Sequence, residues 1–504
     1  MRRFWFVCCC LMLLVGLAVS TAWAQEPARK TYIVRFKPEY QLPEQGSHAE
    51  VVKMLQASVK KNLPVLKKVI KTDDLTPLWI INGVALEATT TEIGHIKKLP
   101  NVLSAKPSRY QIWVPVDTEA RPVKSHKGNQ WSIVKVKAPE VWNELKIDGT
   151  GIVVGHLDTG IDAGHPDLMG KVLAFKDFTP NAKPAPYDDQ GHGTHTAGSI
   201  AGGNGVGVAP GAKLIVAKVF DRKGGAEDTW LLQAMQWVMD PDGIPETNDG
   251  PKLVSNSWGS NATTDRTFWD AVQAWVAAGI VPVFAAGNNG PSGKVGTPAG
   301  FPHSWAVAAT TSSNGIAYFS SVGPSVWDGI TLVKPDIAAP GQGVVSCKIG
   351  GGYVSNSGTS MACPHVAGVV ALMLQANPAL TIDQVRSIAE STALDLGAAG
   401  KDTKFGAGLI DALACVKKVL EGASLAPAYE AYEAALAAER ALIGVQATTP
   451  LSGPLARSLL QRTQALDEGE LVSLRAALQQ SGSPAARALF EEAARLRKAG
   501  DLNR

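Results

Sequence analysis

Three polar residues, far apart in the sequence, have the side chains that nucleophilic catalysis needs: Asp158, His192 and Ser360. A serine hydroxyl is a poor nucleophile until a base removes its proton, and a neutral imidazole can take that proton and return it to a leaving amine. A carboxylate can accept the imidazole N–H and stabilise the imidazolium. Asn288 follows an apolar run and carries an amide that can donate to an oxyanion. Together these residues predict acyl transfer by a serine nucleophile.

Each of these residues also has a plainer interpretation when it is taken alone. Ser360 fits an ordinary helix N-cap, and Asp158 fits a loop aspartate that caps the next segment. Asn288 fits a turn residue, and its neighbour Asn289 is an alternative amide donor. Gly358, two residues before Ser360, permits an unusual backbone turn there.

The histidines leave a second choice. His195 competes with His192 for the role of base, but it lies three residues further along the expected helix, deeper under the glycines, and we interpret it as structural. Glycines on both sides of His192 allow its ring to lie close to a neighbouring backbone. The His-x-x-His pair lacks the spacing and the glutamate of a zinc metallopeptidase helix, so no metal is expected there.

The elements that must position these residues have an α/β pattern from residue 131 to about residue 420. Short apolar strands alternate with helical stretches, and their continuous Val, Ile and Ala runs are typical of strands buried on both faces. We expect strands at residues 152–157, 214–219, 253–255, 281–285 and 306–309. The pattern predicts three layers, with a mostly parallel sheet between two layers of helices. Glycine-rich turns follow several strands, at the edge where open α/β sheets bind their ligands.

The two flanking regions have different patterns. Residues 31–115 run as strand, helix, strand, strand, helix, strand, which predicts a small α+β, ferredoxin-like sandwich. Within it, residues 78–81 and 84–88 are expected to be strands joined by a hairpin turn at Asn82-Gly83. Residues 424–504 are rich in Ala, Leu, Arg and Glu at helical spacing, and they predict a helical C-terminal extension.

Residues 1–24 have the form of a secretory signal peptide, with Arg2-Arg3, an apolar run and Ala22-Trp23-Ala24. We therefore expect a secreted protein, extracellular or periplasmic. No other segment is long and apolar enough to cross a bilayer, so no membrane contact is expected after signal cleavage. A net charge of +3 without a basic block excludes nucleic acid as an expected partner.

Four motifs carry a resemblance to a known family. They are Asp158-Thr159-Gly160, His192-Gly193-Thr194-His195, Gly358-Thr359-Ser360-Met361-Ala362 and the Asn288 segment. In this order they resemble the subtilases, the subtilisin-like serine peptidases. The resemblance covers residues 131 to about 420, and Asn256-Ser257-Trp258-Gly259 makes it closest to the bacillopeptidase F branch.

The resemblance implies a secreted serine endopeptidase made as a self-processed zymogen. Residues 31–115 would be the inhibitor propeptide, residues 128–420 the subtilisin-like catalytic domain, and the junction would be cut between Pro115 and Asn129. Protein or peptide substrates would bind as an added strand between two segments. The implied substrate-binding residues are Gly224, Gly225, Ala226, Ser257, Trp258, Gly259, Ala286 and Gly287.

No cofactor is implied for the chemistry, and no metal residue is assigned. Structural calcium occurs in the family, but residues 201–209 are too short for its usual calcium-binding insertion. Asp177, Asp188 and Asp189 are interpreted as turn carboxylates rather than as ligands.

The cysteines point to packing rather than chemistry. Cys347, Cys363 and Cys415 cannot all pair within one chain, and Cys363 is a buried packing residue by the family pattern.

Two other functions remain to be weighed. One is a catalytically inactive peptide-binding protein on the same fold. The other is a structural protein in which the helical extension is the working part. A lipase is excluded, because its Gly-x-Ser-x-Gly motif and its Ser, Asp, His order are missing.

Overall fold

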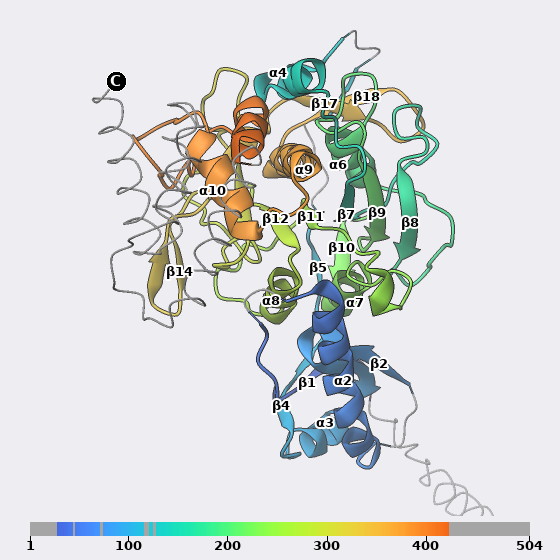
Figure 1. Cartoon of the computed structure of the whole chain (residues 1–504). Coiled ribbons are helices and arrows are strands. Elements are labelled where there is room, and N and C mark those ends of the chain that lie inside the picture. Colours follow the sequence, from blue (N-terminus) through green and yellow to red (C-terminus); the bar gives the residue numbers. More distant parts are fainter. Residues whose placement is uncertain (1–27, 44–45, 71–73, 115–119, 124–127, 423–504) are drawn as a thin grey trace, which may run out of the picture.

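The computed structural model describes residues 28–43, 46–70, 74–114, 120–123 and 128–422. The expected signal peptide and the expected helical extension lie outside these residues. The described chain forms a small N-terminal lobe, residues 28–114, and a larger α/β unit, residues 128–422, that lie against each other (Figure 1).

A seven-stranded sheet forms the centre of the α/β unit, in the order β16-β13-β12-β11-β7-β9-β8. Every neighbouring pair in it is parallel, which confirms the expected parallel sheet. The strands are β7 (Val153–Asp158), β8 (Val172–Asp177), β9 (Lys213–Lys218), β11 (Leu253–Asn256), β12 (Val281–Ala285), β13 (Trp305–Thr310) and β16 (Ile337–Pro340). The two edge strands, β8 and β16, are not among the strands expected from the sequence.

Helices cover both faces of this sheet (Figure 1). Alternate side chains of β9 enter opposite cores, with Leu214 and Val216 on one face and Ile215 and Ala217 on the other. The helices are α4 (Trp131–Lys135), α5 (Ala138–Glu140), α6 (His192–Ala201), α7 (Asp228–Trp237), α8 (Trp269–Ala277), α9 (Thr359–Ala376) and α10 (Ile382–Thr392), with a π-helical turn at Val141–Leu145 and a 3₁₀ turn at Pro245–Thr247.

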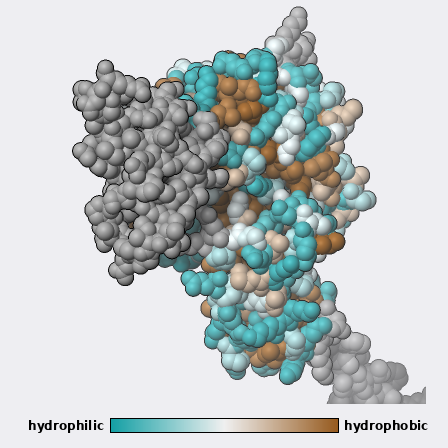
Figure 2. All heavy atoms as spheres, in the orientation of Figure 1, coloured by the Kyte–Doolittle hydropathy of each residue, from teal (hydrophilic) through white to brown (hydrophobic). Residues whose placement is uncertain are grey.

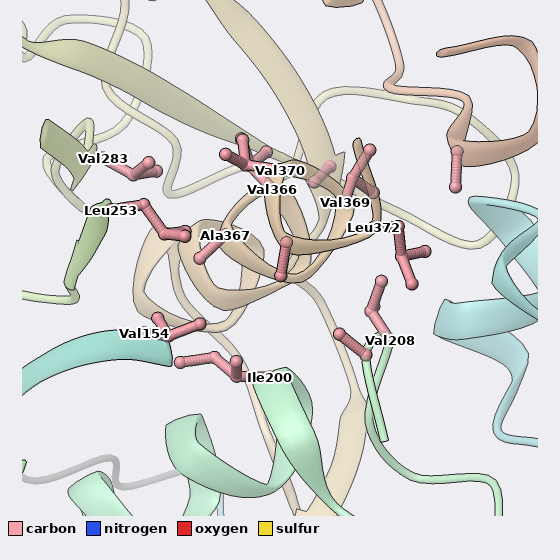
Figure 3. Close-up of a cluster of buried hydrophobic side chains, with 14 of the residues drawn as sticks. Val154, Ile200, Val208, Leu253, Val283, Val366, Ala367, Val369, Val370 and Leu372 are labelled. Carbon is pink, nitrogen blue, oxygen red and sulfur yellow. The ribbon is translucent and has the colours of Figure 1, made fainter. Parts of the chain in front are cut away.

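Helix α9 lies at the centre of the first core. Its Val366, Val370 and Leu372 side chains are surrounded by residues of β7, α6, β11 and β12 (Figure 3). By length and composition α9 could span a membrane, but 83% of its apolar window is buried inside the protein. It is therefore the core helix of this unit.

The N-terminal lobe contains an antiparallel sheet in the order β2-β3-β1-β4 with two helices. Its elements are β1 (Lys30–Phe36), α2 (His48–Lys67), β2 (Leu75–Leu78), β3 (Gly83–Ala88), α3 (Thr90–Ile96) and β4 (Val102–Pro107). This order confirms the expected small α+β unit. Helix α3 begins with a capping box between Thr89 and Glu92.

The strand expected at residues 78–81 is wrong. Trp79–Ile81 form a 3₁₀ turn, and Asn82 after it is left-handed with φ 48°. The Asn82 side chain accepts a hydrogen bond from the Ser58 hydroxyl (2.8 Å) and donates to the Phe36 carbonyl (3.3 Å). These contacts with α2 and β1 fix a turn that local propensity does not predict.

An apolar core continues from the α/β unit into the lobe. Val52, Leu55 and Ile80 of the lobe are buried against residues of α7 and α8. Around this contact, the His48 ring lies 2.6 Å from the Met239 carbonyl oxygen, and Arg35 forms an ion pair with Asp270. The outward face of the lobe in Figure 2 is mainly hydrophilic, as expected if its apolar surface faces the α/β unit.

Four further pairings connect short strands in three small sheets. The expected extended segment after residue 102 divides, because β5 (Tyr110–Ile112) leaves the lobe sheet and pairs antiparallel with β10 (Gly225–Glu227). Strand β6 (Arg121–Val123) pairs with β18 (Tyr353–Asn356), which pairs with β17 (Val344–Cys347). Strands β14 (Ser325–Trp327) and β15 (Ile330–Leu332) form a separate hairpin.

Truncation of the α9 core should destabilise the whole unit. Leu372 has no exposed surface, so Leu372→Ala should lower the free energy of unfolding by about 2–5 kcal/mol. Leu394 is 51% exposed, and Leu394→Ala should change it by less than about 0.5 kcal/mol. Urea titration in a Ser360→Ala background, chosen to prevent self-digestion, measures both. Equal effects of the two variants would contradict the assignment of α9 as the core helix.

Candidate functional site

Asp158 and His192 lie together at the carboxyl end of the central sheet. Asp158 is the last residue of β7, and His192 is the first residue of α6. The Asp158 Oδ1 atom lies 2.7 Å from His192 Nδ1, which therefore donates to it. The Thr159 backbone N–H also donates to Oδ1 (2.7 Å), and the Thr196 hydroxyl lies 3.1 Å from Oδ2.

The charge on Asp158 is stabilised by these partners. Burial alone would raise the pKa of this carboxyl, because the side chain is fully enclosed. The charge and hydrogen bond of His192 outweigh burial, with smaller help from His156 and the Thr159 N–H, and the pKa lies below its ordinary value. Asp158 is thus a carboxylate that fixes one imidazole nitrogen as a donor.

Glycines allow the two segments to approach this closely. A Cβ atom on Gly193 would lie 2.2 Å from the Gly160 carbonyl oxygen, so the start of α6 lies directly on the turn after β7. The Gly193 N–H donates to the Thr159 hydroxyl oxygen (2.8 Å). This contact brings the main chain of α6, rather than the His192 ring itself, against the neighbouring backbone.

Lys218 stabilises the turn after β7, and Asp188 stabilises the beginning of α6. The buried Lys218 ammonium donates to the Thr159 carbonyl oxygen and to Asp189, both at 2.7 Å. Asp188 accepts from the backbone N–H groups of Gly191 (2.8 Å) and Thr194 (2.9 Å), so it caps the beginning of α6.

Ser360 is the second residue of α9, next to the end of β11. Its hydroxyl donates to the Ser257 carbonyl oxygen (3.1 Å), and the Ser257 hydroxyl donates in turn to the Ser360 carbonyl oxygen (2.8 Å). Helix α9 packs against α6, which carries His192. The unusual turn expected at Gly358 is wrong, because its backbone is extended with φ 161°.

Asn288 is exposed, and its side chain is oriented by the residue before Ser360. Its Oδ1 atom accepts from the backbone N–H of Thr359 (2.8 Å) and from the Thr359 hydroxyl (2.9 Å). With the oxygen engaged, the Nδ2 amide is the group left to donate. The alternative, Asn289, donates its amide to Asn261 instead (2.6 Å). Sequence reasoning missed Thr359, and its position beside Ser360 was the only signal for it.

His195 has a different environment from His192. It is completely buried, and its Nε2 atom lies 3.0 Å from the Val344 carbonyl oxygen. Burial lowers its pKa to about 3, so the ring stays neutral. This agrees with the structural interpretation of His195.

The expected substrate-binding segment at Gly224, Gly225 and Ala226 pairs with the N-terminal lobe. The backbone N–H groups of Trp113 and Val114 both donate to the Gly224 carbonyl oxygen, at 2.9 and 3.1 Å. A Cβ atom on Gly225 would lie 2.0 Å from the Tyr110 hydroxyl. At Gly224, which has φ 76°, a Cβ atom would lie 1.8 Å from the Val114 carbonyl oxygen, so the close approach of the lobe backbone requires a glycine there.

Trp113 inserts its side chain among aromatic residues of the α/β unit. It is 4% exposed, and its ring centroid lies 5.6 Å from that of Trp258 and 5.5 Å from that of Phe268, both edge-on. Its indole N–H donates to the Ala226 carbonyl oxygen (3.3 Å). The sequence does not predict a role for Trp113, because its aromatic neighbours come from distant segments that only the fold brings together.

The other expected substrate-binding residues have mixed environments. Ser257 contacts Ser360, and Trp258 is buried in the aromatic cluster around Trp113. Gly287 donates its N–H to the Thr359 hydroxyl (3.1 Å), and Ala286 is buried. Within the described residues, no strand pairs with residues 257–259, including Gly259.

Asp177 and Asp189, which were considered as cation ligands, accept hydrogen bonds from donors within the protein. Asp177 accepts from the Tyr187 hydroxyl (2.7 Å) and from backbone N–H groups, and Asp189 pairs with Lys218. In the short loop at residues 201–209, the Asn204 amide donates to Asp167.

Comparison with known proteins decides the family. The sequence pattern of the subtilase family matches residues 149–408. Bacillopeptidase F of Bacillus subtilis (strain 168) is 35% identical over 404 residues, which are 73% of this chain but 28% of that protein. The chain belongs to the subtilase family.

Other subtilases match over nearly their whole length. Alkaline elastase YaB of Bacillus sp. (strain YaB) is 32% identical over 425 residues, 81% of this chain and 97% of that protein. Subtilisin NAT of Bacillus subtilis subsp. natto is 32% identical over 418 residues, with the same coverage. At family level the chain is a serine-type endopeptidase, and subtilases need no cofactor for their chemistry.

All three cysteines in the described residues are free and buried. Burial raises the pKa of the Cys363 and Cys415 thiols to about 12, and it also raises that of Cys347. Cys363 lies 3.7 Å from the Ser255 hydroxyl, inside the core.

These thiols should be inert in the folded chain, since the thiolate is the reactive form. A chain expressed from residue 25, which lacks the cysteines of the expected signal peptide, should release no chromophore from an aromatic disulfide reagent at neutral pH. In denaturant it should titrate as three thiols. Rapid labelling of the folded chain that disappears in Cys363→Ala would contradict the packing role of Cys363.

Proposed function

We propose that this chain is a serine endopeptidase that hydrolyses peptide bonds through Ser360, His192 and Asp158. The observation that carries the proposal is the 2.7 Å hydrogen bond between His192 Nδ1 and the buried Asp158 carboxylate, formed where β7 meets α6. With Nδ1 as a donor, Nε2 of His192 is the nitrogen that can accept a proton. Ser360 supplies a half-buried hydroxyl at the start of the neighbouring helix.

The first step is attack of Ser360 Oγ on the substrate carbonyl carbon. The hydroxyl turns from the Ser257 carbonyl oxygen, and His192 Nε2 removes its proton as the C–O bond forms. Hydrogen bonds of this kind often tighten only when substrate is bound. His192 then gives the proton to the leaving amine, and water releases the acyl group by the reverse path. Asp158 remains ionised and stabilises the imidazolium.

Asn288 and the Ser360 backbone N–H stabilise the oxyanion. The exposed Asn288 amide is directed by Thr359, which we assign as a positioning residue. In subtilisin, itself a member of this family, removal of one oxyanion donor is known to lower kcat by about 10²–10³-fold.

The N-terminal lobe is proposed to be an inhibitor propeptide. It lies on the Gly224–Ala226 segment that a substrate strand would use, and Trp113 occupies the aromatic cluster beside it. Arg109 of the lobe pairs with the buried carboxylate of Asp228 (2.9 Å), and Tyr110 donates to Asp221 (2.7 Å). Residues 1–24 are proposed as the secretory signal, which would make the mature enzyme extracellular or periplasmic.

Self-processing is proposed to cut the chain between Val114 and Arg121. Val114 ends the contact with Gly224, whereas β6, which begins at Arg121, pairs with β18. Strand β18 ends at Asn356, four residues before Ser360. Both sides of the junction are therefore paired with the α/β unit, and the β6 side is paired with the strand that precedes Ser360.

Substitution of the nucleophile tests the activity directly. Ser360→Ala should abolish casein cleavage and leave the full-length precursor uncut, because no other described side chain takes over the attack. The parent chain should react with a fluorophosphonate probe, and Ser360→Ala should not.

Two results would overturn this assignment. A processed and active Ser360→Ala enzyme would exclude Ser360 as the nucleophile. A parent chain that binds peptides but fails to react with the probe would favour an inactive peptide-binding protein.

The proposed binding edge predicts a preference for an aromatic side chain. In a peptide covering residues 108–123, offered to the mature enzyme, Trp113→Ala should lower kcat/KM at least about tenfold, since a buried aromatic anchor is worth 2 kcal/mol or more. Ile112 is 49% exposed, so Ile112→Ala should change kcat/KM less than about threefold. Mass spectrometry of the products locates the cut. Equal effects of the two substitutions would contradict the binding mode.

A further inference from the structure

Three aspartates gather in the loop between α7 and β11. Asp240, Asp242 and Asp249 each offer a carboxylate oxygen, and these three oxygens lie within 4.8 Å of one another. Calcium binds oxygen ligands at about 2.3–2.6 Å, so oxygens around one ion are separated by up to about 5 Å. The spacing of the three carboxylates fits a single calcium ion.

One of these carboxylates is buried with an oxygen that no protein group satisfies. Asp240 is 6% exposed, and its Oδ1 atom has no hydrogen-bond partner among the described residues. Its other oxygen, Oδ2, accepts from the Gln56 amide (3.1 Å). A buried carboxylate oxygen without a partner is costly, and a bound cation would remove that cost.

Backbone donors shape the loop around the other two carboxylates. Asp242 Oδ1 accepts from the Ile244 N–H (2.8 Å), and Asp249 Oδ2 accepts from the Asp242 N–H (3.1 Å). In the described part of the chain the hydrogen bond to Asp242 engages only Oδ1, which leaves Oδ2 of this exposed side chain available to a ligand.

The basic side chain that acts on Asp240 is His48, whose ring lies 2.6 Å from the Met239 carbonyl oxygen. Among the residues that the structure describes, no lysine or arginine forms an ion pair with any of the three aspartates. Burial, followed by repulsion from the neighbouring Asp242 carboxylate, raises the pKa of Asp240 and Asp249. The cluster also follows the carboxyl end of α7, where the helix dipole favours positive charge.

We propose that Asp240, Asp242 and Asp249 form a calcium site at the end of α7. The ligands are hard carboxylate oxygens, which suit calcium and not a thiophilic metal. The site lies where helix α2 of the N-terminal lobe meets the α/β unit, since Gln56 contacts Asp240 directly. It is independent of the catalytic residues.

Terbium luminescence tests the site without using activity. The Trp237 indole donates to the Pro241 carbonyl oxygen (3.1 Å), so this tryptophan lies beside the cluster and can sensitise a bound Tb³⁺ ion. The full-length Ser360→Ala chain should show sensitised emission that calcium displaces. Asp242→Asn and Asp249→Asn should each lower calcium affinity at least about tenfold, because ligand charge sets affinity in such sites. Glu87→Gln removes one exposed charge from the lobe and should change nothing.

Thermal unfolding separates metal binding from a merely structural role. In EDTA, Asp242→Asn should unfold at the same temperature as the Ser360→Ala chain or higher, since it removes a repulsive charge. In calcium, the Ser360→Ala chain should gain stability relative to Asp242→Asn.

Three results would overturn the proposal: no Tb³⁺ emission from the Ser360→Ala chain, unchanged calcium affinity in both asparagine variants, or equal calcium-dependent stabilisation with and without Asp242. Displacement of Tb³⁺ by magnesium as effective as by calcium would overturn the choice of metal.

Discussion

The buried charge of Asp158 is the constraint on which the arrangement around it depends. A carboxylate without exposed surface is unstable unless it is paired and hydrogen-bonded. His192 supplies the pair and the Thr159 N–H a further bond, so the ring of His192 can take only one orientation. Gly193 packs directly on Gly160, and Lys218 holds the turn after β7. These contacts bring α6 close enough to β7 for His192 to reach Asp158. The geometry proposed for catalysis is thus also the arrangement that stabilises the buried Asp158 carboxylate.

The N-terminal lobe also pairs with a backbone edge of the α/β unit, at Gly224 and β10. The Gly224 carbonyl oxygen and the β10 backbone would be unpaired without another chain, and β5 with Trp113 and Val114 provides the missing partners. Main-chain pairing needs no particular side chains, so the same edge can accept many peptides. The selectivity proposed for it comes from the aromatic cluster around Trp258, which Trp113 enters.

The central strands could be predicted because burial on both faces forces an unbroken apolar run. That is why β7, β9, β11, β12 and β13 were located, and why the polar residues directly after them stood out. Strand β8 was missed because most of its residues are half-buried or exposed, which weakens the pattern. The turn at Trp79–Ile81 was mistaken for a strand because contacts of Asn82 with other elements decide its shape.

The proposed site could be anticipated from the sequence only where the chemistry requires a particular residue type. Asp158, His192 and Ser360 carry groups that few other residues could replace, so their spacing was informative. Thr359 and Trp113 act through contacts with Asn288 and Trp258 that only the folded chain creates. The local sequence sets Thr359 apart only by its place beside Ser360, and nothing in it sets Trp113 apart from an ordinary core residue.

The buried aspartates of the described chain show why the loop after α7 differs from the rest. Most of them have a cationic neighbour, as Asp336 has in Lys334 (2.6 Å), or donors to both carboxylate oxygens, as Asp167 has in Asn204 and Tyr353. Asp240 forms no ion pair with a lysine or arginine among the described residues and has a donor to only one of its oxygens, and two further carboxylates lie beside it. A buried carboxylate oxygen without a partner, with two like charges beside it, is costly. The proposed calcium ion would remove that cost, since it would give Asp240 the positive neighbour that the other buried carboxylates find within the chain.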